Sequence, residues 1–156
     1  MAKRKIFYSF HFNNDVFRIQ QVRNMGVIEG NEPVSPNTWE DLKKSDASVE
    51  KWIDDNISGK SCVVVLIGSE TSTRKWVKYE IKKAVSDGKG VLGIYVHNLK
   101  DPTTGTCTKG ANPFTGLGLT RAGAAFVPKV YDPKSDDAYK DIAANLSVWI
   151  EAAIAQ

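Results

Sequence analysis

The sequence contains little of what several common kinds of site require. It has two cysteines and two histidines in 156 residues. Cys62 lies in an apolar run and Cys107 in a Thr/Gly-rich segment, and neither has a Cys or His at metal-ligand spacing. We therefore expect neither a disulfide framework nor a metal site.

Long apolar runs and a strong charge of one sign are also absent. No stretch reaches the ~20 apolar residues that cross a bilayer, and the N-terminus lacks the apolar region of a signal peptide. The net charge of +3 is too small to indicate a nucleic-acid partner. We predict a cytoplasmic protein with no membrane and no nucleic-acid partner, and a length of 156 residues fits a single domain over 1–156.

Strand-like runs alternate with segments of helical periodicity along the chain. Strands are predicted over 5–10, 61–67 and 91–96, with a stub at 27–28 and a short edge strand within 124–131. Helices are predicted from 16 to 26, from Ser45 or Asp46 to Gly59, from the turn at 68–72 to about Asp87, and from Ser135 or Asp136 onward. This order predicts an α/β fold, a flavodoxin-like three-layer sandwich with a mostly parallel sheet of four or five strands and helices on both faces.

Ligands of such sheets bind beyond the carboxyl ends of the strands, and the loops predicted there exclude several chemistries. The central strand ends without a carboxylate at 66–69, so a phospho-acceptor aspartate is missing. The loop over 9–14 has no glycine and is no standard phosphate cradle. A G-x-S-x-G elbow is absent. Residues 97–123 form a long Thr-, Gly- and Pro-rich loop, which is typical of a functional segment.

The two histidines each follow a predicted strand on the ligand side. His11 comes after the first strand and His97 after the fourth. The imidazole pKa suits acid–base work, but a lone histidine at a strand end is more often structural, so the pattern favours a structural role for both.

Glu80 lies at an informative position of the third predicted helix. A helical wheel places it roughly 60° from the buried stripe, with Trp76 one turn earlier. A carboxylate beside an indole can be partly desolvated, which raises its pKa and suits it to act in a pocket. The alternative is an exposed charge that pairs with Lys78 or Lys83, and the spacing leaves both interpretations open.

Three stretches in the right order resemble a TIR-like domain of the kind that forms the TIR subunit of the Thoeris anti-phage system. The run KIFYSF at 5–10 resembles the first TIR strand, 63–69 resembles the strand that ends in a small-residue turn, and STRKWVKYEI at 72–81 resembles the helix that carries tryptophan and glutamate. Further matches lie at 39–41 and 109–114.

The resemblance implies an NAD-cleaving enzyme, an NAD nucleosidase or ADP-ribosyl cyclase. TIR enzymes break the nicotinamide–ribose bond with the glutamate that Glu80 matches, so NAD is implied as the substrate, with no prosthetic group. It also implies a cyclic ADP-ribose-type product that signals to a separate NAD-depleting effector, a phage-derived trigger and a homo-oligomer. The nucleotide pocket is expected to involve Ser9, Phe10, His11, Trp39, Trp76 and Tyr79, with Tyr8, Trp76 and Tyr79 as stacking walls for the adenine.

The sequence departs from the family pattern at two places. Val77 stands where the family usually has cysteine, and the loop before the second helix lacks the usual TIR sequence. Some TIR domains are non-catalytic interaction modules, so that function is an alternative, as is a flavodoxin-like nucleotide sensor.

Overall fold

A computed structural model of the protein describes most of the chain. The described residues are 5–10, 18, 20–22, 29–30, 45–99, 105–135 and 137–155. Two residues predicted to line the nucleotide pocket, His11 and Trp39, lie outside these ranges.

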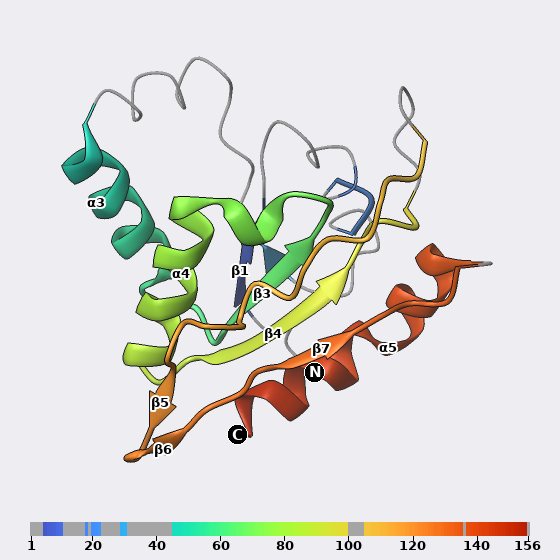
Figure 1. Ribbon diagram of the computed structural model, residues 1–156. Coiled ribbons are helices and arrows are strands. Elements are labelled where there is room, and N and C mark those ends of the chain that lie inside the picture. Colours follow the sequence, from blue (N-terminus) through green and yellow to red (C-terminus); the bar gives the residue numbers. More distant parts are fainter. Residues whose placement is uncertain are drawn as a thin grey trace.

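A parallel β-sheet forms the centre of the molecule (Figure 1). Its strands are β1 (Lys5–Ser9), β2 (Glu29–Gly30), β3 (Cys62–Ile67), β4 (Gly90–Tyr95) and β7 (Lys129–Tyr131). They lie in the order β2-β1-β3-β4-β7, and every neighbouring pair is parallel. The predicted fold class is confirmed, and β7 is the short edge strand expected within 124–131.

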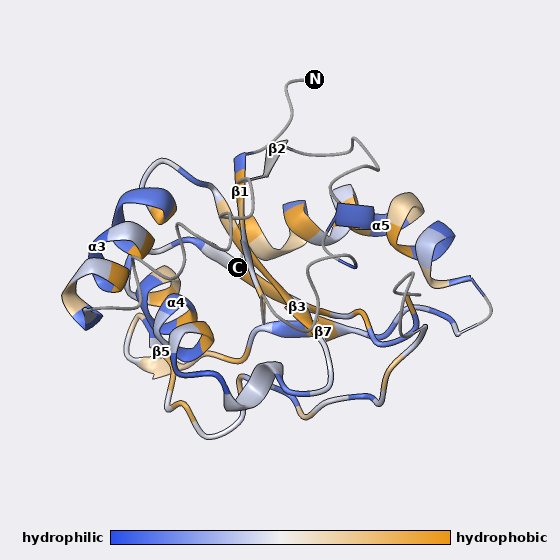
Figure 2. Ribbon diagram, turned by 90° about the horizontal axis from the view of Figure 1, so that it is seen from above, coloured by the Kyte–Doolittle hydropathy of each residue, from blue (hydrophilic) through white to orange (hydrophobic). Residues whose placement is uncertain are grey.

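Helices cover both faces of the sheet. Helices α3 (Asp46–Ile57) and α4 (Lys75–Ser86) lie on one face, and α5 (Ala138–Ile154) lies on the other (Figure 1). Seen from above, the apolar residues of β1 and β3 lie between these layers (Figure 2). Of the first predicted helix, residues 18 and 20–22 are described, and they are helical.

The side chains of β3 alternate between two apolar cores, although all six residues are buried. Val64 and Leu66 belong to the core under α5, whereas Val63 and Val65 belong to the core under α3 and α4. This alternation explains why the run is continuously apolar, because a central parallel strand is covered on both faces.

The ends of α3 follow the capping signals of the sequence. The Ser45 side chain accepts a hydrogen bond from the Ser48 backbone N–H at 3.3 Å. Gly59, just beyond the helix, has a φ of 80°, a conformation that favours glycine.

Two details of the sequence prediction need correction. Asp137 caps α5 by accepting from the Lys140 N–H at 3.1 Å, in place of the predicted Ser135 or Asp136. The predicted strand stub at 27–28 lies outside the described residues, and Glu29–Gly30, directly after it, pair with the start of β1. A hairpin of β5 (Thr120–Arg121) and β6 (Ala124–Ala125) interrupts the long predicted loop.

Candidate functional site

Glu80 lies on the buried side of α4 and contacts the end of β1. Its side chain is on the sheet-facing side of the helix, and the residue is only 7% exposed. The Ser9 Oγ–H donates a hydrogen bond to Glu80 Oε1 at 2.9 Å, and Ser9 itself is fully buried. The last residue of β1 and the second turn of α4 therefore meet at the carboxyl edge of the sheet, as the sequence predicted for a ligand site.

Burial changes the acid–base behaviour of Glu80. Removal from water raises the pKa of this carboxyl from 4.5 to about 8, and the hydrogen bond from Ser9 partly opposes that rise because it favours the charged form. At neutral pH Glu80 is therefore mostly protonated. Such a carboxyl is ready to ionise when a positive charge comes near it.

No cation neutralises Glu80 among the residues that the structure describes. Lys83 pairs instead with Asp87, at 3.3 Å between Nζ and Oδ1, and Lys78 is exposed. The interpretation of Glu80 as a solvated surface charge paired with one of these lysines is therefore wrong.

The turn between β3 and α4 fixes where the helix of Glu80 begins. The Thr71 hydroxyl accepts a hydrogen bond from the Gly68 N–H at 2.8 Å, and Thr71 is fully buried. A 3-10 helix, Thr71–Thr73, follows, and α4 starts at Lys75. Gly110 packs against this turn so closely that a Cβ there would overlap the Gly68 carbonyl oxygen.

Two of the predicted pocket residues lie near Glu80 on α4 but face the neighbouring helix α3. The Tyr79 hydroxyl donates to Asp54 Oδ1 on α3 at 2.8 Å, and the rings of Trp76 and Tyr79 meet edge to face at 5.7 Å. Both rings line a hollow of about 420 Å³ together with residues that include Glu50. The structure thus brings Ser9 to the Glu80 carboxyl, whereas the Tyr79 hydroxyl is engaged elsewhere.

Two aromatic residues of β1 and its end lie on the opposite face from Ser9. Tyr8 is 2% exposed within the core under α5, so the expectation that its ring forms a stacking wall for the adenine is wrong. Phe10 is partly buried and packs against the same core. The reason is the alternation of side chains along a strand.

A charged cluster that sequence analysis did not assemble lies at the carboxyl ends of β4 and β7. Lys109 Nζ pairs with Asp132 Oδ2 at 2.7 Å and lies 4.5 Å from the centre of the Tyr95 ring. His97 meets the same ring edge to face at 6.1 Å. Asp132 comes directly after β7. Because ligands bind at the carboxyl ends of parallel strands, this position could have identified Asp132 as a candidate site residue from the sequence.

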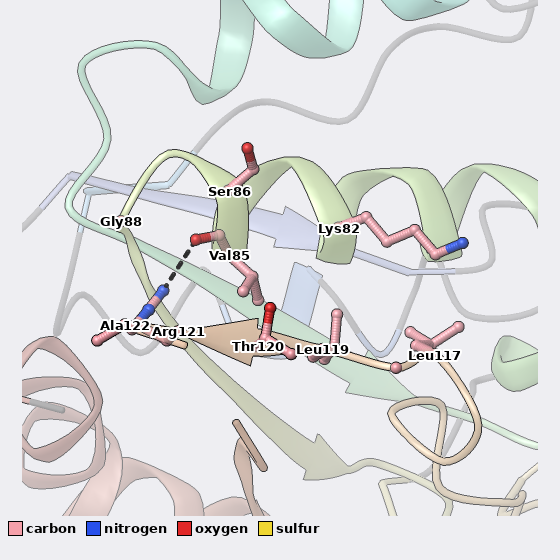
Figure 3. A pocket seen from close by; sticks show the side chains of 10 residues that line it. Lys82, Val85, Ser86, Gly88, Leu117, Leu119, Thr120, Arg121 and Ala122 are labelled. Atoms are coloured by element: carbon pink, nitrogen blue, oxygen red, sulfur yellow. Dashed lines mark hydrogen bonds between the residues drawn. The ribbon is translucent and has the colours of Figure 1, made fainter. Parts of the chain in front are cut away.

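A larger hollow lies along the last turns of α4, away from Glu80. It has a volume of about 710 Å³ and is lined by α4 and residues 117–122 (Figure 3). Arg121 donates to the Lys89 carbonyl oxygen at 2.7 Å and to that of Val85 at 3.4 Å. This side chain satisfies carbonyl groups near the helix end, and none of the predicted site residues lines the hollow, so we place the candidate site at Glu80.

The described residues offer no group of three or more His, Cys, Asp or Glu side chains that could hold a metal ion. Within the same part of the chain, no helix is both long and apolar enough to cross a membrane.

A parallel sheet covered by helices on both faces, with a buried glutamate on the helix after its central strand, defines a TIR-like α/β domain. Residues 7–101 match the family described as "Thoeris protein ThsB, TIR-like domain", and the chain belongs to this family. The resemblance stated from the sequence is confirmed.

A relative from Bacillus cereus is similar over most of the chain. The chain is 40% identical over 124 residues to the "Putative cyclic ADP-D-ribose synthase ThsB1" of Bacillus cereus (strain MSX-D12), and the match covers 76% of this chain. The match spans 64% of the length of that relative.

Proposed function

We propose that this protein cleaves NAD at the bond between nicotinamide and ribose and forms a cyclic ADP-ribose-type product in Thoeris anti-phage defence. The observation that carries the proposal is the buried Glu80 carboxyl, held by Ser9 at the ligand edge of the sheet. The substrate class follows from the family and from the name of its 40% identical relative.

Glu80 is suited to the step in which the glycosidic bond breaks. Nicotinamide leaves with the bonding electron pair and becomes neutral, so it needs no proton from an acid. The ribosyl group becomes oxocarbenium-like, and the Glu80 carboxylate stabilises that charge in a site with little water. An adenine nitrogen then attacks the ribosyl carbon and closes the ring, and the cationic adenine that results becomes neutral by releasing a proton. Attack by water would instead give ADP-ribose and also release a proton.

The raised pKa of Glu80 is compatible with this role. The positively charged pyridinium of NAD favours the ionised carboxylate, so substrate binding lowers the pKa of Glu80 from its raised value of about 8. Because kcat/KM reports the ionisation of the free enzyme, we expect it to rise with pH up to about 8 and then to level off.

The test is to incubate the purified protein with NAD and analyse nicotinamide and nucleotide products by mass spectrometry. We expect Glu80→Gln to lower turnover by about 100-fold or more, while Glu151→Gln, an exposed glutamate on α5 on the opposite face of the sheet, leaves it unchanged. Full activity of Glu80→Gln would show that the assignment of the catalytic residue is wrong.

An inert wild type, assayed with a phage lysate present as a source of trigger, would favour the non-catalytic interaction module. Thermal stabilisation by FMN but not by NAD or ADP-ribose would favour the flavodoxin-like sensor.

In the proposed function, the product acts on a separate NAD-depleting effector. Several expectations stay predictions: a phage trigger, a homo-oligomer and a cytoplasmic location. The same holds for contacts with the nucleotide from Phe10, His11, Trp39, Trp76 or Tyr79.

A further inference from the structure

The charged cluster at the ends of β4 and β7 is not used by the cleavage step. We define the β4–β7 cluster as Tyr95, His97, Lys109 and Asp132. Its members come from the ends of two neighbouring strands and from the loop between them, and Lys109 lies over the Tyr95 ring while pairing with Asp132. A cluster of this kind at the carboxyl edge of a parallel sheet lies where ligands of the fold bind.

We propose that the β4–β7 cluster binds the phosphate groups of the dinucleotide, with Lys109 as the principal contact and His97 as a second one. The inference rests on the proposed function, because it assigns a subsite to the substrate that Glu80 cleaves. The chemical class that it recognises is a pyrophosphate ester.

The position of the cluster relative to Glu80 suits a dinucleotide. Ser9 pairs in register with Val65 of β3, and β4 lies next to β3. Two strand spacings of about 4.8 Å each therefore separate the β1 end from the β4 end. Gly110, next to Lys109 in the chain, packs on the turn at Gly68 that precedes the helix of Glu80. A ligand with ribose at Glu80 can extend its phosphates along this edge.

Lys109 can bind an anion with little loss of stability, because its present ion pair is weak. The side chains of Lys109 and Asp132 are 48% and 45% exposed, and ion pairs this exposed contribute little to stability. A phosphate can therefore replace the Asp132 carboxylate as the partner of Lys109. The contact with the Tyr95 ring holds the ammonium group at the edge of the sheet while this exchange takes place.

His97 has unused hydrogen-bonding capacity on the same side. Its Nδ1 atom is buried and has no partner among the described residues. Burial lowers the pKa of His97, Asp132 opposes this, and Lys109 and Arg18 lower the pKa further. Arg18 donates to the carbonyl oxygens of Leu99 and Gly105, at 3.0 and 2.8 Å, so it contributes a fixed positive charge beside the cluster.

The experiment measures binding of inorganic pyrophosphate and ADP-ribose by calorimetry, and the His97 ring signals by NMR. Because the chain has only two histidines, a His97→Gln variant assigns the signals. We expect both ligands to raise the His97 pKa, since an anion favours the imidazolium. Lys109→Met should weaken ADP-ribose binding about tenfold, and Lys140→Met, an exposed lysine on α5, should not.

Asp132→Asn gives the decisive comparison, because it removes the carboxylate that competes for Lys109. We expect it to tighten pyrophosphate binding about threefold, the opposite of Lys109→Met. A purely structural ion pair would make the two variants behave alike. Equal affinities of Lys109→Met and wild type, or His97 signals unmoved by either ligand, would overturn the proposal.

Failure of the subsite can be separated from failure of the proposed function. If the protein binds pyrophosphate at the cluster but does not cleave NAD, then the cluster is an anion site and the proposed NAD-cleaving function is wrong. If NAD is cleaved and Lys109→Met raises the KM for NAD and for nicotinamide riboside equally, the enzyme stands and the phosphate subsite is wrong, because the riboside has no phosphate.

Discussion

At the ends of β1 and β3, Glu80 is buried with a serine hydroxyl as its partner, whereas at the ends of β4 and β7, Lys109 and Asp132 form a half-exposed ion pair. Both regions belong to the same edge of one sheet. In the first, removal from water governs the carboxyl and raises its pKa to about 8. In the second, each charge has a partner of opposite sign and keeps contact with solvent.

This difference suits the two regions to different roles at the carboxyl edge of the sheet. Among the described residues no cation lies beside the desolvated Glu80 carboxyl. Such a carboxyl is costly to hold in its charged form, so it gains most when a positive charge develops beside it. An exposed pair exchanges partners easily and suits ligand binding. This difference supports the two proposals, bond cleavage at Glu80 and anion recognition at Lys109.

The first prediction concerns stability and separates the two regions most strongly. The folded state keeps a proton on Glu80 at pH values where the unfolded chain, with a pKa near 4.5, has released it. Rising pH therefore destabilises the fold through this group, up to about pH 8. We expect Glu80→Gln to stabilise the protein, by roughly 3 kcal/mol more at pH 8 than at pH 5, as measured by urea unfolding at both pH values.

The matched variant for this measurement is Asp132→Asn in the other region. Because its carboxylate is exposed and paired with Lys109, we expect its effect on the free energy of unfolding to change little between pH 5 and pH 8. An effect of Glu80→Gln that is the same at both pH values would mean that the carboxyl ionises freely in the folded protein.

The contrast was only partly predictable from the sequence. The apolar run of β3 and the helical spacing of α4 are local patterns, so the fold and the place of Glu80 on its helix could be predicted. The helical wheel predicts Glu80 at the boundary between core and solvent. Only the packing of α4 on the sheet shows that Ser9, from a strand distant in sequence, donates a hydrogen bond to its carboxyl. The hairpin β5–β6 was missed because its strands have two residues each, too short for a recognisable alternation.

The second prediction tests whether Ser9 tunes the carboxyl. Its hydroxyl donates to Glu80 Oε1 and favours the charged form, so Ser9→Ala should raise the pKa of Glu80 still further. We expect kcat/KM for NAD at pH 7 to fall by about 5- to 10-fold and the pH profile to move upward, with activity recovering above pH 9.

Two variants control this measurement. Ser9→Thr keeps a hydroxyl and should retain the wild-type profile, and Ser86→Ala, at an exposed position of α4, should change nothing. A loss of activity in Ser9→Ala that is equal at all pH values would indicate a direct contact of Ser9 with the nucleotide, as first predicted from the resemblance.

The smallest effect is expected at Tyr79, on the side of α4 that faces α3. Its hydroxyl donates to Asp54, so Tyr79→Phe should lower the free energy of unfolding by about 1 kcal/mol and leave kcat and KM unchanged. Asp54→Ala, which removes the acceptor, should cost a similar amount, and the double variant little more, because both single changes remove the same hydrogen bond. Tyr79→Leu also removes the ring, and if it raises the KM for NAD, then the ring of Tyr79 contacts the nucleotide. If it lowers stability alone, this face of α4 serves helix packing and the chemistry is confined to the side of Glu80.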